Sequence, residues 1–173
     1  RITFMKSSLT TDLKNTAKQL GADLVGIGDM NRFDGAPKNW DPRYIFPEAK
    51  AIICLAFRIP RGALRGNEEG TNFYQYPAMA YSNINEVHAP GVLHRLAGKI
   101  EDMGYEAVPY RNVGSSGPLS DMTGTTSESA DLGRKVRHTK PLRDGQPAPD
   151  VFFHFHIAAF ICGLGEIGYS KVF

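Results

Sequence analysis

The last thirteen residues, ICGLGEIGYSKVF, carry the pattern most typical of a binding site. Gly163, Gly165 and Gly168 stand at G-x-G-x-x-G spacing, which in a dinucleotide-binding unit lets backbone N–H groups approach a pyrophosphate. Such a unit also needs a strand before the glycines, a helix after them and an acidic residue about 20 positions further on. Only five residues follow Gly168 in this sequence. We therefore expect these glycines to serve another purpose.

Other residue types that carry chemistry are present without the spacing that their chemistry needs. His154 and His156 are two positions apart, whereas a zinc pair on a helix needs a spacing of three or four, so we expect packing histidines. The chain has no G-x-S-x-G, P-loop or C-x-x-C pattern, which removes the support for a hydrolase or a kinase. Cys54 and Cys162 lie in apolar runs and are expected to be buried thiols, which is typical of a cytoplasmic protein.

The composition predicts a soluble globular domain. The chain has 173 residues, of which 42% are hydrophobic and 22% charged. Its net charge of +2 neither demands nor excludes an anionic partner. No apolar run approaches the roughly 18 residues that would span a bilayer, so no membrane partner is expected.

The helices and strands that would position these residues follow from the periodicity. Residues 8–21 are predicted to form a helix that Gly21 ends, because apolar residues recur at helical spacing before it. Residues 22–30 are predicted to form a short strand, and residues 49–60 a central buried strand, because an apolar run there is stopped by Pro60.

A second helical pattern covers residues 74–103, with Gly104 at its end. Pro77 and Pro90 are expected to divide or kink it. Residues 105–110, YEAVPY, alternate as a short strand that could lie at an edge. The following residues, 112–150, show no apolar period and predict a long binding loop, lid or disordered segment, whose basic run GRKVRHTK we interpret as a solvated face. The apolar run VFFHFHIAAFICG could be helix or strand.

Four segments, read in order from about Leu9 to Phe173, resemble the corrinoid-binding part of the epoxyqueuosine reductase and reductive dehalogenase superfamily. They are LGADLVGIGDMNRF, FPEAKAIICLAFRIP, IEDMGYEAVPY and HIAAFICGLGEIGYSKVF. The last is the most specific, because an alanine-rich apolar segment before G-L-G-x-x-G is the superfamily's signature, with Glu166 typical of the dehalogenase-like branch. The tryptophan that epoxyqueuosine reductases usually have there is absent, as is any D-x-H-x-x-G pattern that would supply a histidine ligand to cobalt.

The resemblance implies an α/β (α+β) fold of the nitroreductase-like type, a mixed sheet flanked by helices, as a single domain over residues 1–173 that holds base-off cobalamin. It also implies a following ferredoxin-like domain with two [4Fe–4S] clusters. Two such clusters need eight cysteine thiolates, and this chain has two cysteines. We therefore expect the iron–sulfur domain to lie outside this chain, and the sequence to be the N-terminal region of a longer protein.

The resemblance also assigns a use to the glycines. A corrin is a broad, mostly apolar disc fringed with amides, and backbone without Cβ atoms can lie close against it. Gly163, Gly165 and Gly168 would supply that close approach, and Leu164 and Ile167 would support the turn. The next groups able to reach the cofactor are Tyr169, Ser170 and Lys171.

Superfamily members reduce their substrates at a low-valent cobalt centre while a nearby acid delivers a proton. Asp150, thirteen residues before Gly163, is the best candidate for that acid, although it could instead cap the segment that follows. Tyr105 and Tyr110 are alternatives, because a tyrosine has this role in dehalogenases.

The function expected from the resemblance is that of a cytoplasmic cobalamin- and iron–sulfur-dependent reductase, of which this fragment alone would be inactive. Its substrate would be a tRNA-borne epoxide, an organohalide or another small molecule, and its partner a low-potential electron donor. One alternative is a non-catalytic corrinoid carrier. The other is an FMN-dependent oxidoreductase of the same fold, in which Arg58, Arg61 or Arg65 could meet the flavin phosphate.

Overall fold

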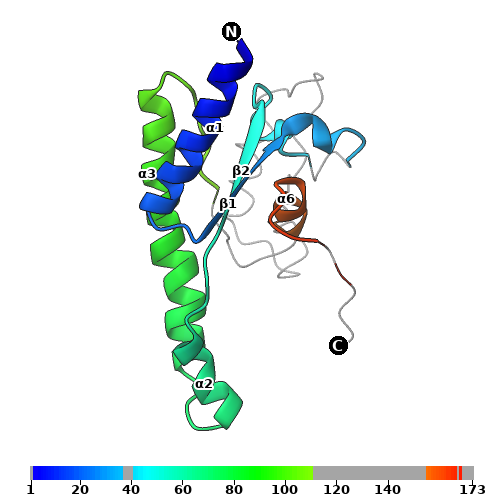
Figure 1. Ribbon diagram of the computed structural model, residues 1–173. Coiled ribbons are helices and arrows are strands. Elements are labelled where there is room, and N and C mark those ends of the chain that lie inside the picture. The colour runs from blue at the N-terminus through cyan, green and yellow to red at the C-terminus, as the bar shows by residue number, and fades with distance from the viewer. Residues whose placement is uncertain (1, 37–40, 111–154, 167, 169–173) are drawn as a thin grey trace, which may run out of the picture. The chain divides into compact units, whose positions relative to one another are not determined.

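The computed structural model describes residues 2–36, 41–110, 155–166 and 168 (Figure 1). These residues form a mixture of helices and a two-stranded antiparallel sheet, so the expected α+β class is confirmed at that level. The chain divides into two compact units. Of the described residues, 2–27 and 53–110 belong to the first unit and the others to the second.

Helix α1 spans Ile2–Gln19 and ends at a glycine, as predicted, although it begins earlier than expected. Gly21 adopts a positive φ of 119°. The N–H of Gly21 donates to the Lys18 carbonyl, and the N–H of Ala22 donates to the Ala17 carbonyl. These two bonds satisfy carbonyls that the end of a helix leaves open, and a residue without Cβ adopts the required φ most easily.

The sheet consists of β1, Leu24–Asp29, and β2, Ala51–Ala56, and confirms both of these predicted strands. The N–H of Asp23 donates to the Ala56 carbonyl at 3.0 Å, and the N–H of Met30 donates to the Lys50 carbonyl at 3.1 Å. The expected burial of β2 is not observed. Among the described residues it pairs with β1 alone, and its residues are half-buried or exposed.

The predicted helical segment is present and is divided near Pro90. It contains a π-helix, η4, over Tyr76–His88 and an α-helix, α3, over Ala89–Asp102. Both prolines lie in the first turn of their helix, where a missing N–H costs least. In Figure 1, α1 lies beside α3 in the first unit.

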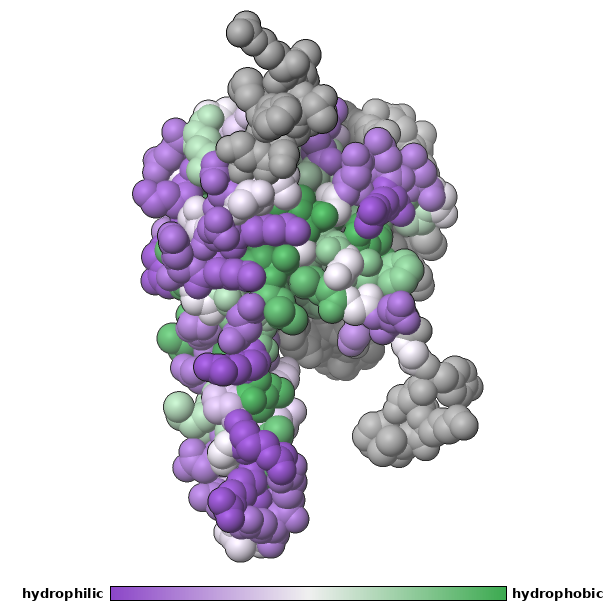
Figure 2. Space-filling view, viewed as in Figure 1, coloured by the Kyte–Doolittle hydropathy of each residue, from purple (hydrophilic) through white to green (hydrophobic). Residues whose placement is uncertain are grey.

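Helix α2, Arg61–Glu69, packs on η4 and was not predicted. It carries two ion pairs, Arg61 with Glu68 and Arg65 with Glu69. The surface over α2 is mostly hydrophilic in Figure 2. Ala63 and Leu64 are the only aliphatic side chains in the nine residues of this helix, which is too few to set an apolar period in the sequence.

The strand predicted over residues 105–110 is wrong. Gly104, with a φ of 85°, ends α3, and the residues after it form no strand. Tyr105 and Val108 are 58% and 48% exposed. Because one is from each of the two alternating sets of side chains, neither set is packed on a core as one face of a strand would be. A strand needs a neighbour that accepts its hydrogen bonds, and the described residues place none beside this segment.

Each unit has its own apolar core. The buried core of the first unit consists of residues from α1, β1, α3 and the turn between α1 and β1, namely Ala17, Ala22, Val25 and Leu96. The buried core of the second unit joins the residues that follow β1 to α6, and consists of Met30, Phe33 and Ile161. The candidate site residues around the glycine signature depend on the second core for their position.

The run that could have been helix or strand is described from Phe155 onward, and there it forms helix α6, Phe155–Ile161. The helix packs closely on Gly28, a residue of β1 that belongs to the second unit, since a Cβ placed on Gly28 would lie 2.9 Å from Ile161 Cγ2 and 3.0 Å from its carbonyl oxygen. Arg32 strengthens this contact by donating from Nη1 to the same Ile161 carbonyl. None of the helices in the described ranges combines the length and the apolar content needed to cross a bilayer.

Candidate functional site

The first glycine of the signature ends helix α6. Gly163 has a φ of 71° and its N–H donates to the Phe160 carbonyl, while the N–H of Leu164 donates to the Ala159 carbonyl. This is a Schellman motif, in which a glycine is favoured for local reasons alone. A helix precedes the glycines where a dinucleotide fingerprint needs a strand, which agrees with the expectation that they serve another purpose.

Gly165 and Gly168 have no such local reason to be glycine. Neither has a positive φ, and no described atom lies within 4 Å of the place where a Cβ would stand on either residue. Both residues are exposed. Their backbone is therefore open to the approach of a ligand, as expected of glycines that lie against a corrin.

The other residues expected to support the glycine turn or to reach the cofactor are only partly described. Leu164 is half-buried directly after the helix, in keeping with a role in supporting the turn. Ile167, Tyr169, Ser170 and Lys171 lie outside the described residues.

None of the three candidate proton donors lies among the described residues of the second unit, which holds the glycine turn. Asp150 lies outside the described residues, as does the expected loop over residues 112–150. Tyr105 and Tyr110 lie in the first unit, where Tyr105 is 58% exposed and Tyr110 is half-buried, whereas the glycines lie in the second.

The three arginines of the flavin alternative are each paired with a carboxylate. Arg58 contacts Asp23 at 3.4 Å, and its backbone N–H also donates to that carboxylate at 2.9 Å. Arg61 and Arg65 pair with the glutamates of α2, and all three side chains are more than 70% exposed. A flavin phosphate would have to displace these partners, so this arrangement gives the flavin alternative no support.

The cysteines and histidines have different outcomes. Cys162 is buried, as expected, and its Sγ donates to the Ile52 carbonyl at 3.6 Å. Cys54 is only half-buried, so its expected burial is not observed, and both cysteines are free thiols. His156 is exposed on α6, so the expectation that it packs in the core is wrong, and His154 lies outside the described residues. Within the described ranges, no group of three or more His, Cys, Asp or Glu side chains could hold a metal ion.

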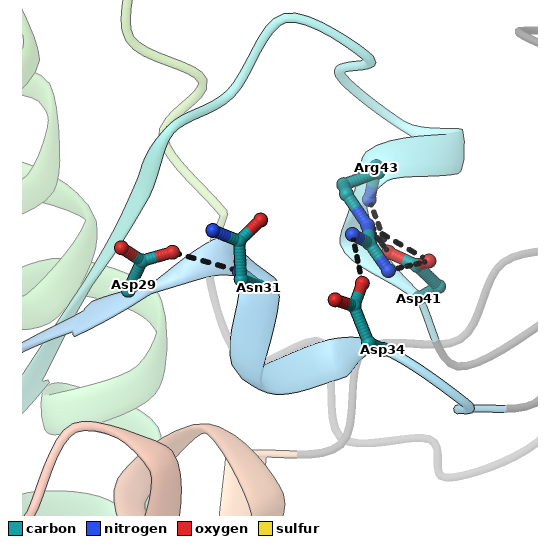
Figure 3. Close-up of polar contacts among 5 residues, drawn as sticks. All are labelled: Asp29, Asn31, Asp34, Asp41 and Arg43. Atoms are coloured by element: carbon teal, nitrogen blue, oxygen red, sulfur yellow. Dashed lines mark hydrogen bonds and ion pairs between the residues drawn. The ribbon is translucent and has the colours of Figure 1, made fainter.

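The structure reveals a charge cluster that the sequence analysis missed. Arg43 Nε donates to Asp41 Oδ1 at 2.9 Å, and Arg43 Nη1 donates to Asp34 Oδ1 at 2.7 Å (Figure 3). Asp41 is 5% exposed and the Arg43 side chain 11% exposed. The hydrogen bond to Asp41, and after it the one to Asp34, raises the pKa of Arg43 above its ordinary value. The guanidinium therefore stays protonated at every pH at which the protein is folded.

Local sequence explains how this cluster forms. The short 3₁₀ helix η3, Pro42–Tyr44, begins after Asp41, whose carboxylate accepts the N–H of Arg43 at 2.9 Å. Aspartate at a helix N-cap followed by proline is a recognised start signal. The triplet Asp41, Pro42, Arg43 could therefore have indicated an ordered, charged turn.

A pocket of about 240 Å³ lies beside Arg43 in the second unit. Its polar lining residues are Asp29, Asn31, Arg43 and Lys50, and Pro47 and Ala49 add apolar surface. A second 3₁₀ helix, η1 (Met30–Phe33), places Asn31, because Asp29 caps this helix by accepting the Asn31 N–H at 2.8 Å. The described lining of the pocket offers the hydrogen-bond donors of Asn31, Arg43 and Lys50 and one carboxylate, that of Asp29.

These features define the class of the protein as an α+β protein with an exposed glycine turn after a helix and a small polar pocket. Comparisons with protein-family models, curated proteins and solved structures found no match to this chain. The function proposed for this chain therefore depends on its own residues and motifs.

Proposed function

We propose that this chain is the corrinoid-binding part of a cobalamin- and [4Fe–4S]-dependent reductase, in keeping with the superfamily signature at its carboxyl end. The observation that carries the proposal is the state of Gly165 and Gly168. Their backbone is exposed, and nothing within the described residues requires either position to be glycine. Close approach by a broad ligand would explain why side chains are absent there.

The neighbouring residues suit an apolar disc with a polar fringe. Phe160 on α6 is 54% exposed and Leu164 is half-buried, so apolar surface lies next to the glycines in the chain. The exposed amides of the glycine turn would donate hydrogen bonds to the fringe of the corrin. Bound cobalamin, in its base-off form, would supply a low-valent metal centre for reduction.

The remaining roles follow from the same proposal. Asp150, Tyr105 or Tyr110 would deliver the proton, and a low-potential donor would supply electrons through clusters held by a further domain. The substrate would be a tRNA-borne epoxide, an organohalide or another small molecule. A carrier that binds the corrinoid without catalysis would use the same glycine turn, and iron–sulfur cysteine motifs beyond Phe173 in the reading frame would distinguish the enzyme from the carrier.

The test is corrinoid binding by the 173-residue chain. We expect the chain to retain hydroxocobalamin through gel filtration, as read from the visible spectrum. Gly165→Leu should weaken binding about tenfold or more, because its side chain would occupy the space that the disc needs.

The matched control is Gly62→Leu, since Gly62 on α2 also has no described atom within 4 Å of its Cβ position. It should leave the affinity for corrinoid unchanged. A chain that retains flavin and no corrinoid, or equal effects of the two substitutions, would contradict the proposal.

A further inference from the structure

The small pocket in the second unit lies apart in the sequence from the glycine turn, and neither the resemblance nor the proposed reductase assigns it a ligand. Its volume of about 240 Å³ is below the ~300–1,000 Å³ of sites that enclose a drug-sized molecule. It therefore suits a ligand of a few heavy atoms, or one side group of a larger ligand.

The charges around the pocket disfavour a simple ion. Lys50 and Arg43 are the cations that line it, but Arg43 already binds the carboxylates of Asp34 and Asp41. Asp29 is the one carboxylate among the lining residues, and together with the two aspartates bound to Arg43 it offsets the charge of the two cations, so an anion would gain little net attraction. A metal cation is disfavoured too, because Asp34 and Asp41 are held by Arg43 and only Asp29 remains among the carboxylates.

The hydrogen-bonding groups of the pocket call for a ligand that both accepts and donates. Lys50 and the guanidinium of Arg43 are donors only, whereas the carboxylate of Asp29 is an acceptor only. Figure 3 shows Asp29 accepting from Asn31 at the end of β1, and Arg43 on η3 held by its two aspartates. The main chain that carries these groups is hydrogen-bonded, since Asp29 caps η1 and the N–H of Met30 donates to the Lys50 carbonyl.

We propose that this pocket binds a primary carboxamide. The carbonyl oxygen of such a group accepts from Lys50 or Arg43, and its NH₂ group donates to Asp29, so a neutral ligand satisfies both kinds of lining group. The carboxamide belongs either to a small free amide or to the amide fringe of a bound corrinoid. The proposal stands on the pocket alone and does not require the glycine turn to bind a corrinoid.

The experiment uses the 173-residue chain labelled with ¹⁵N and titrated with propionamide, propionate and glycine. Propionamide should shift the backbone amide signals of Asn31 and Lys50 in a saturable way, and the other two probes should not. Lys50→Met removes a charged donor and Asp29→Asn replaces a charged acceptor by a neutral one, so each should raise the Kd for propionamide about tenfold.

Lys99→Met is the matched control, because Lys99 is an exposed lysine on α3 that pairs only weakly with Asp102, at 3.7 Å. It should leave the Kd for propionamide unchanged. A stronger response to propionate or glycine than to propionamide, or no saturable shift at all, would overturn the proposal.

A second titration, with dicyanocobinamide, identifies the source of the carboxamide. A loss of affinity in Lys50→Met places a corrinoid amide in the pocket. Unchanged corrinoid affinity, together with a weakened response to propionamide, assigns the pocket to a small free amide. If Lys50→Met alters neither titration, the carboxamide site is refuted, whatever the glycine turn binds.

Discussion

At the scale of the residue, the Arg43 cluster shows how burial decides the worth of a charge. The same guanidinium binds two carboxylates, but the side chain of Asp41 is 7% exposed and that of Asp34 is 70% exposed. A buried ion pair loses much when one partner is removed, because the other charge is left without compensation. An exposed pair is screened by water and contributes little.

The first prediction compares the two aspartates. Asp41→Asn should lower the free energy of unfolding by about 3 kcal/mol, because it leaves the buried charge of Arg43 without its buried partner. It also weakens the N-cap of η3. Asp34→Asn should change it by less than about 1 kcal/mol. Urea unfolding followed by circular dichroism measures both values, and equal losses in the two variants would show that Asp41 is not buried as described.

The glycine signature is also a matter of single residues. Gly163 is explained by the end of α6, so its presence alone says little about a ligand. The evidence for a ligand comes from the two glycines that the fold does not require. A pattern of three glycines thus separates into one with a local cause and two that carry the functional proposal.

At the scale of the element, α2 shows a glycine required by close packing. A Cβ on Gly66 would lie 2.2 Å from the backbone oxygen of Asn72, and the Gly66 carbonyl accepts the N–H groups of Thr71 and Asn72. The turn after the helix therefore folds back directly onto this position. Gly62, on the same helix, meets nothing within 4 Å.

The second prediction contrasts these two glycines. Gly66→Ala should destabilise the first unit by about 1–3 kcal/mol, because the clash is with backbone that must shift. Gly62→Ala should be neutral or stabilising by up to about 1 kcal/mol, because alanine favours helix. Thermal unfolding measures the difference, and a stabilising Gly66→Ala would contradict the close approach of the turn.

At the scale of the whole molecule, the two units have separate buried cores. Leu96 belongs to the first core and is 4% exposed, whereas Ile161 belongs to the second and is 7% exposed. Local unfolding follows such cooperative units, so damage to one core should be felt most by the amides that it protects.

The third prediction uses this division. Leu96→Ala and Ile161→Ala should each lower the free energy of unfolding by about 3 kcal/mol. Leu96→Ala should speed amide hydrogen exchange mainly in the first unit, and Ile161→Ala mainly in the second. Exchange followed by mass spectrometry measures both patterns. Uniform acceleration by either variant would mean that the two units unfold as one.

The helices and strands that the sequence predicts correctly have causes that lie close together in the chain. The glycine end of α1 and the division of the helical segment near Pro90 depend on residues within a few positions of each other. The apolar run of β2 predicts a strand for the same reason. Local chemistry limits the backbone conformations there, whatever the rest of the chain does.

The predictions that differ from the structure depended on distant partners. The alternation in residues 105–110 indicates a strand only if another strand lies beside it, and the burial expected of β2 needs covering elements on both sides. Helix α2 carries its ion pairs on a mostly polar surface, so no apolar period revealed it.

The sequence by itself determined the local conformations and the glycine spacing, because glycine, proline and capping side chains act within a turn or two of backbone. Only the tertiary structure decided which charges are buried and which groups line the polar pocket. Asp29, Asn31, Arg43 and Lys50 are separated by up to 21 positions, and packing alone brings them to one cavity. The value of each charge depends on exclusion of water by the fold, which no local pattern reports.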